Sequence, residues 1–207
     1  MTRHLAKCEK RAQIIQSANA GKQREETLWH LRVQGARAKE FWLDLEMRGS
    51  ATLEKLDDYL RAIWLECCGH LSEFTVGGWG GVELDNAEIV DDVFTWEPDL
   101  LHLYDFGTTS ETEIHVVGSR RGKPTTKHPI ALMSRNNMPI AECKECGKLA
   151  THLCMECLIE TDEEGAWFLC AEHAETHPHT DYGDPKLLVN SPRVAMCGYE
   201  GPAEPPY

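Results

Sequence analysis

The stretch CKECGKLATHLCMECLIETDEEGAWFLCAEHAETHPH (residues 143–179) carries the densest pattern in this sequence. It contains cysteine and histidine pairs at metal-ligand spacing: Cys143/Cys146, Cys154/Cys157, Cys170/His173 and His177/His179. A CxxC turn places two thiolates on one side of a tight loop, where they can occupy two corners of a tetrahedron around Zn²⁺. Four such pairs predict two zinc ions per chain.

The order of the ligand pairs predicts a cross-brace, in which alternate pairs share an ion. One zinc would then be held by the first and third pairs, Cys143, Cys146, Cys170 and His173. The second would be held by Cys154, Cys157, His177 and either His179 or Cys197. We favour Cys197, because Pro178 makes simultaneous ligation by His177 and His179 sterically awkward. Protein ligands at all four corners would make both ions structural. A single zinc with spare cysteines, or thiols and disulfides without metal, are the alternatives.

The other cysteines lie far from this stretch. Cys8, Cys67 and Cys68 are interpreted as ordinary buried thiols. Neither a signal peptide nor an apolar run of membrane-spanning length is recognisable in the sequence. We therefore expect a cytoplasmic protein with no membrane segment, whose cysteines serve as metal ligands rather than disulfides.

Composition limits the classes of function. The 207 residues are 42% hydrophobic, enough for a moderate domain with a small appendage. With 21 Lys and Arg against 34 Asp and Glu, the net charge is −13 at pH 7. Such an acidic chain repels nucleic acid unless positive charge is concentrated locally, so nucleic acid is not the favoured partner.

Upstream of the cysteines, the hydrophobic pattern alternates between strand and helix periods. Residues 41–47 follow the two-residue period of a half-buried strand, and residues 53–67 carry apolar side chains at three- and four-residue intervals after a capping Thr52. Further predicted elements are a strand at 70–76, a short helix at 89–94, a hairpin at 101–106 and 112–117, and a last strand at 130–133.

The N-terminal residues differ in character from the rest. Residues 1–39 are polar, locally basic and helix-prone, and two helical pieces separated near residues 20–21 are expected. The predicted organisation is a basic helical arm at 1–39, a central domain at 40–140, and a zinc-binding module with a C-terminal segment at 141–207.

Several short motifs together resemble a known family. FWLDLEM, TLEKLDDYLRAIW, HLSEF, YDFG followed by TEIHVV, and the late NSPRVAMCGY occur in the order seen in the Ri-plasmid ORF-three-like family, also known as insertion-element passenger proteins. The resemblance implies an α+β domain with a mixed, largely antiparallel sheet and packed helices, with a cysteine-rich tail in some members. It implies no activity. The segment between residues 76 and 101 is shorter and more acidic than in the family, and the N-terminal arm lies outside the match. The metal-ligand spacing resembles B-box and MYND fingers.

Our leading hypothesis is a zinc-stabilised interaction module without catalytic activity that binds another protein. The alternative is a nucleic-acid-associated accessory protein of a mobile element or defence system, which would use the arm and a basic loop: Arg120, Arg121, Lys123 and Lys127. A second alternative is a metal-dependent hydrolase built from polar residues on strands, His70, Glu73 and Asp105, with His102 and His115. Asp105 is also well suited to cap a hairpin turn, which is its structural interpretation.

Overall fold

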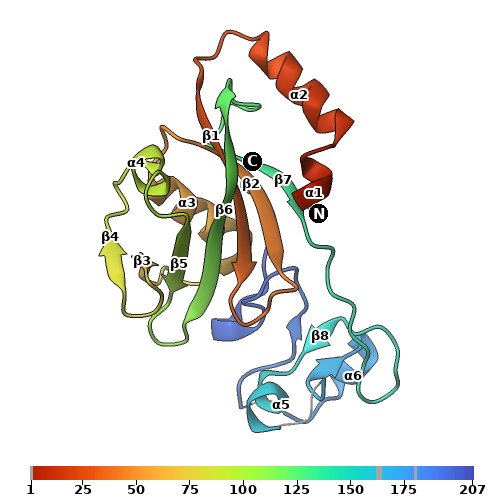
Figure 1. The fold of residues 1–207 in the computed structure, drawn as a ribbon. Helices are drawn as coiled ribbons and strands as arrows, with labels where there is room; N and C mark the ends of the chain where they lie inside the picture. The colour runs from red at the N-terminus through yellow and green to blue at the C-terminus, as the bar shows by residue number, and fades with distance from the viewer. Residues whose placement is uncertain (1, 162–164, 180) are drawn as a thin grey trace. The chain divides into compact units, whose positions relative to one another are not determined.

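Two compact units make up the chain in this computed structural model, which describes residues 2–161, 165–179 and 181–207 (Figure 1). The sheet unit comprises Met1–Arg61, Leu71–Asn136 and Pro205–Tyr207. The finger unit comprises Ala62–His70 and Asn137–Glu204. Ala62–His70 thus group with the finger, whereas the sequence pattern places them in the central domain.

A seven-stranded antiparallel sheet forms the sheet unit, in the order β4-β3-β5-β6-β1-β2-β7. Its strands are β1 (Glu26–Gly35), β2 (Trp42–Arg48), β3 (Ser72–Val76), β4 (Val82–Leu84), β5 (Asp99–Tyr104), β6 (Ser110–Gly122) and β7 (Ile130–Arg135). The expected α+β class is therefore confirmed, and all the pairings in the described part of this sheet are antiparallel. The hairpin of β5 and β6 lies where the sequence predicted it.

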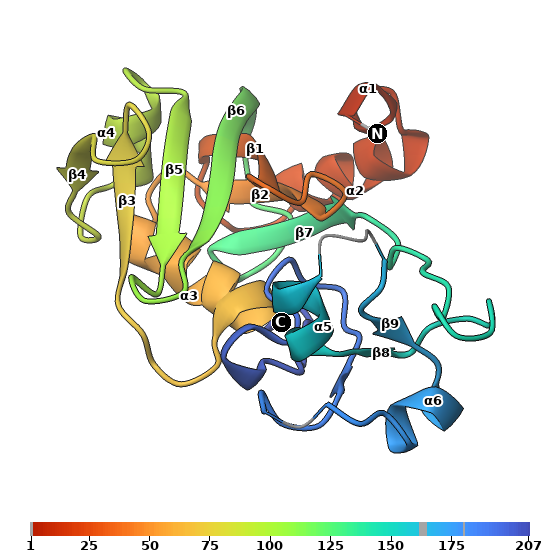
Figure 2. The same cartoon turned by 90° about the horizontal axis from the view of Figure 1, so that it is seen from below.

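Helix α3 (Leu53–Leu60) lies across one face of the sheet (Figure 2). Leu53, Leu56 and Leu60 are fully buried, as their helical spacing predicted. A π-helical turn, η1 (Arg61–Leu65), continues α3 into the finger unit. The short helix α4 (Val90–Phe94) also occurs where it was expected.

The start of α3 differs from the prediction. The Thr52 side chain makes no capping hydrogen bond. Instead, the backbone N–H groups of Leu53 and Glu54 donate to the carbonyl oxygens of Glu88 and Asn86. The loop before α4 therefore satisfies the first N–H groups of α3, which a helix end otherwise leaves without partners.

Strand β2 is buried on both faces, although its alternation predicted one polar face. Leu43, Leu45 and Met47 are 0% exposed on the core side. The alternate side chains Asp44 and Glu46 are also only 0% and 5% exposed. Polar side chains cover these two carboxylates: His30 and Arg32 contact Asp44, and Arg11 and Arg120 contact Glu46.

The N-terminal arm is only partly helical, so the expectation of helix throughout residues 1–39 was wrong. Helices α1 (Thr2–Leu5) and α2 (Glu9–Asn19) precede β1, an interior strand of the sheet. Leu28 of β1 lines a cavity with Ala6 and Arg11 of the arm, whereas Leu31 and Val33 are 0% exposed. Because Leu28 and Leu31 occupy opposite sides of an alternating strand, apolar residues appear on both faces, and the two-residue period is lost from the sequence.

The finger unit contains little regular structure. A small antiparallel sheet in the order β10-β8-β9 joins β8 (His152–Leu153), β9 (Phe168–Leu169) and β10 (Lys186–Leu187). Its short helices are α5 (Met155–Glu160) and α6 (Ala171–Glu175), and η2 (Met196–Gly198) is a single 3-10 turn. Four of the five residues in its buried cluster are cysteines, Cys143, Cys154, Cys157 and Cys170.

The helices of the described residues are short. The longest of them, α2, has 11 residues and no buried side chain. Over residues 2–161, 165–179 and 181–207, no helix has the length and apolar character needed to cross a membrane.

Candidate metal centres

Site 1 consists of four side chains whose donor atoms all lie within 4.8 Å of one another: Cys143, Cys146, Cys170 and His173. Cys143 and Cys146 flank a tight turn in which the Gly147 N–H donates to the Cys143 carbonyl at 2.8 Å. Gly147 adopts a positive φ of 70°, which glycine tolerates without steric cost. Cys170 precedes the first turn of α6, and this turn contains His173. Strand β9 leads directly into Cys170, so the small sheet positions this second pair.

The spacing of the site 1 donors matches a tetrahedron. The His173 Nδ1 lies 3.3 Å from the Cys143 Sγ and 3.4 Å from the Cys170 Sγ, and the Cys146 and Cys170 sulfurs are 3.9 Å apart. A tetrahedral Zn²⁺ with ligands at about 2.0–2.3 Å separates two sulfurs by about 3.8 Å, and a sulfur from a nitrogen by about 3.5 Å. A disulfide would instead require about 2.05 Å between the sulfurs.

Backbone amides favour the thiolate form of Cys143. Burial acts to raise the pKa of this thiol, but the N–H groups of Cys170, Glu145 and Cys146 and the ring of His173 lower the pKa to about 6. Hydrogen bonds to the charged form have this effect because they replace the solvation that burial removes. The turn therefore presents an anionic sulfur even before a cation is considered.

Site 2 consists of Cys154, Cys157, His177 and His179, again with all donor atoms within 4.8 Å of one another. Strand β8 leads into Cys154, which caps α5 by accepting a hydrogen bond from the Cys157 N–H. The Cys157 Sγ lies 3.4 Å from the His177 Nε2 and 3.2 Å from the His179 Nδ1. Alternate ligand pairs thus share a site, which is the cross-brace order.

His179 occupies the eighth position, so our preference for Cys197 does not match the geometry. The two histidines approach the sulfurs through different ring nitrogens, and their rings lie 4.7 Å apart at 73°. This arrangement removes the steric difficulty that Pro178 suggested. Burial, followed by the proximity of His179, lowers the pKa of His177 and favours the neutral imidazole that metals bind.

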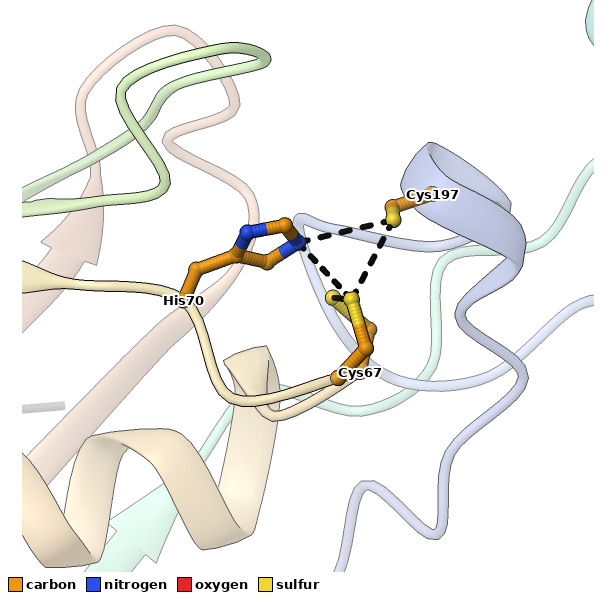
Figure 3. Close-up of side chains that lie close together, drawn as sticks. Cys67, His70 and Cys197 are labelled. Atoms are coloured by element: carbon orange, nitrogen blue, oxygen red, sulfur yellow. Dashed lines mark hydrogen bonds between the residues drawn. The ribbon is translucent and has the colours of Figure 1, made fainter.

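A third cluster, which the sequence did not predict, consists of Cys67, Cys68, His70 and Cys197. Its four donor atoms also lie within 4.8 Å of one another, and Figure 3 shows His70 and Cys197 converging on the Cys67 segment. Cys68 is exposed and Cys67 is half-buried, so their interpretation as ordinary buried thiols was wrong. Cys67, Cys68 and His70 are close in sequence, and Cys67/His70 has CxxH spacing, but no spacing links them to Cys197, which lies 129 positions from Cys68.

The proposed hydrolase residues have separate local roles. His70 belongs to the third cluster. Asp105 accepts a hydrogen bond from the Gly107 N–H at 2.9 Å, which is the turn-capping role anticipated for it. Glu73 lines a shallow depression with the acidic side chains Glu83 and Asp85. His102 and His115 each contact an aspartate, Asp57 and Asp99 respectively.

Some of the basic residues proposed to bind nucleic acid instead form contacts within the protein. Arg120 and Arg121 lie on β6 rather than in a loop. Arg120 forms two short hydrogen bonds to the buried Glu46, and the Lys123 Nζ donates to the Gly21 carbonyl at 2.6 Å. Arg121 and Lys127 are exposed. Only part of this charge therefore remains available to a phosphate backbone.

Comparison with known proteins assigns no function. No family model and no curated protein matches this chain. Among solved structures, a protein of unknown function from Methanosarcina mazei Go1 is similar, with 16% identity and a TM-score of 0.45 over 59% of this chain and 75% of that one. The resemblance to the plasmid family stays a prediction.

Proposed function

We propose that the finger unit is a protein-binding module held together by two structural zinc ions, one in site 1 and one in site 2. The main support is the grouping of eight donors into two sets of four with tetrahedral spacing. Thiolates combined with imidazoles in this geometry favour Zn²⁺ over the oxygen-seeking cations. Because protein donors fill all four corners of each site, neither ion would retain a position for a reacting water.

The composition of the finger core also supports structural zinc. Its buried cluster contains Leu169 and four cysteines, with Trp167 and Ala174 packed against them. Within this cluster, so few apolar side chains bury too little surface to offset the conformational entropy of ordering the segments that carry sites 1 and 2. A closed zinc site contributes on the order of 10 kcal/mol of apparent folding free energy. The two ions would therefore supply the stability that the hydrophobic core lacks.

The binding role is supported by apolar side chains on the surface of the finger. The large apolar residues exposed there are Met138, Ile140, Leu149, Ile159, Tyr182 and Leu187. Ile140 is 85% exposed and Leu149 is 62% exposed. They belong to the two segments that a bridge between Glu142 and Leu149 joins beside the first CxxC turn. Exposed apolar side chains grouped in this way are typical of surfaces that contact another protein.

Comparative capture from lysate of the native cells tests the proposal. The full-length zinc-loaded protein is compared with the double variant Ile140→Asp and Leu149→Asp. Val82→Asp, which changes a 68% exposed apolar residue of the sheet unit, is the matched control. We expect a set of proteins that the wild type and the control retain and the double variant loses, while the zinc content of all three stays equal. Identical retained proteins in all three samples would refute the binding role.

A further inference from the structure

The third cluster lies outside both sites of the proposed finger and draws on two distant segments of the finger unit. Cys67, Cys68 and His70 follow η1, whereas Cys197 lies in η2 (Figure 3). The Cys68 Sγ lies 3.0 Å from the His70 Nε2 and 3.7 Å from the Cys197 Sγ. The Cys197 Sγ lies 3.5 Å from the His70 Nε2, and the sulfurs of Cys67 and Cys68 are 3.8 Å apart.

These separations resemble those of a ligand set around one ion. Tetrahedral zinc sites separate two sulfurs by about 3.8 Å and a sulfur from a nitrogen by about 3.5 Å. Three of the four measured distances fall close to these values, and the fourth, from Cys68 to His70, is shorter. The cluster therefore has both the donor types and the dimensions of sites 1 and 2.

The backbone around the cluster is in unusual conformations that orient the donors. Gly69, between Cys68 and His70, has a φ of +80°, and this bend allows both neighbours to face the same point. On the other segment, Ala195 and Cys197 have φ values of +64° and +50°, which side-chain-bearing residues rarely adopt. Such strain persists only where surrounding interactions impose it, and it is concentrated at functional sites.

Buried polar contacts support the same arrangement. The Ser191 Oγ donates to the Trp64 carbonyl at 2.7 Å and accepts from the Arg193 N–H, which ties the two segments together. Arg193 is 0% exposed, and its Nη2 donates to the Cys67 Sγ at 3.5 Å. A permanently charged guanidinium in the interior favours a nearby anion. Three thiolates and one imidazole around a divalent cation carry one net negative charge, which is complementary to this guanidinium.

We propose that Cys67, Cys68, His70 and Cys197 form a third metal site, which binds Zn²⁺ or a similar thiophilic divalent cation and fastens residues 190–199 to the segment after η1. This site goes beyond the two-zinc finger proposed above. In the third cluster Cys68 and Cys197 are exposed and Cys67 is half-buried, whereas Cys146 is the one exposed cysteine among the five of sites 1 and 2. The third ion therefore exchanges with solvent chelators before the other two.

Native mass spectrometry and cysteine alkylation of the full chain test this site. We expect about three zinc per chain in the wild type and about two in His70→Ala, since one ligand set is lost. His70→Cys keeps a fourth ligand and restores the third ion, an outcome that a purely structural role for His70 does not predict. Cys8→Ser, outside all three clusters, leaves the count unchanged.

Alkylation of the wild type needs no variant and so does not depend on whether a substituted chain folds. In the zinc-loaded protein, Cys68 and Cys197 are expected to resist a thiol reagent despite their exposure, and to react once a chelator removes the first ion. A wild type with only two zincs, with both thiols reactive or joined in a disulfide, overturns the third site. That result leaves sites 1 and 2 untouched, because their cysteines are counted separately in the same experiment.

Discussion

The Cys157 Sγ lies 3.2 Å from the His179 Nδ1, and this contact between residues 22 positions apart completes site 2. The N-cap residue of α5 (Cys154), Cys157 in its first turn and two histidines from the segment after α6 thereby converge on one point. The identity of this fourth ligand determines which substitutions should weaken metal binding at site 2 and which should not.

His179→Ala should open site 2, and Cys197→Ser should not. Removing the imidazole leaves three donors and weakens zinc binding. Alkylation followed by mass spectrometry of the labelled peptides measures the accessibility of Cys154 and Cys157. Both should become reactive in His179→Ala and remain protected in Cys197→Ser. The reverse pattern would restore Cys197 as the eighth ligand.

Removing zinc with a chelator should unfold the finger unit while the sheet unit stays folded. The buried cluster around sites 1 and 2 is made mainly of ligand cysteines, whereas the sheet unit has an apolar core of its own. Hydrogen exchange should therefore become fast at the Thr151 N–H, which donates to the Leu169 carbonyl, and stay slow at the Leu31 N–H in β1. Equal loss of protection at both amides would mean that the two units unfold as one.

Asp57→Asn should destabilise the sheet unit in a pH-dependent manner. Burial acts to raise the pKa of Asp57, but hydrogen bonds from His102 and Ser72 and the charge of Arg61 lower it overall. Breaking one side of such a buried pair costs about 3–5 kcal/mol at pH 7. Because the folded-state pKa is lowered, this stabilisation is present above about pH 4 and is lost as the pH falls below it. Denaturant unfolding of both proteins should show the difference at pH 7 and a smaller one at pH 3. A difference in unfolding free energy that does not change with pH would contradict a stabilising role for the Asp57 charge.

Gly81→Ala should cost stability although Gly81 needs no left-handed backbone. A Cβ there would lie 1.9 Å from the Val76 carbonyl oxygen and 2.9 Å from that of Gly78. The turn between β3 and β4 must move, and overpacking of this kind costs about 1–3 kcal/mol. Gly118→Ala is the control, because its Cβ meets nothing within 4 Å. Equal unfolding midpoints for the two variants would show that the turn adapts freely.

Arg120→Ala should act on stability rather than on nucleic-acid binding. Arg120 bonds the buried Glu46 through two nitrogens, and its removal leaves that carboxylate with fewer partners. We expect Arg120→Ala to lower the free energy of unfolding by about 3 kcal/mol, and the exposed Arg121→Ala to lower it by less than about 0.5 kcal/mol. Chemical denaturation measures both. Oligonucleotide binding that weakens with salt in the wild type and disappears in Arg121→Ala would instead support a nucleic-acid role.

Local pattern accounts for the parts of the structure that the sequence predicted. The alternation of Leu43, Leu45 and Met47 and the helical spacing of Leu53, Leu56 and Leu60 each reflect burial of one face, so both elements were recognised. Strand β1 was not, because the arm covers one of its faces and α3 lies on the other side of the sheet (Figure 2). Burial on both faces removes the period on which recognition depends.

In the metal centres, too, some donors were predicted from local sequence and others were brought together only by the fold. The sequence predicted seven of the eight donors of sites 1 and 2. Six of them follow from the CxxC and CxxH spacings, because a short loop holds each such pair in place, and the seventh is His177. The choice of His179 over Cys197 depended on ring orientation, which spacing does not encode. The third cluster combines three donors from one short run, Cys67, Cys68 and His70, with Cys197, which only tertiary structure brings near them. Cys197 lies 129 positions from Cys68, and only the folded path of the chain brings their sulfurs within 3.7 Å.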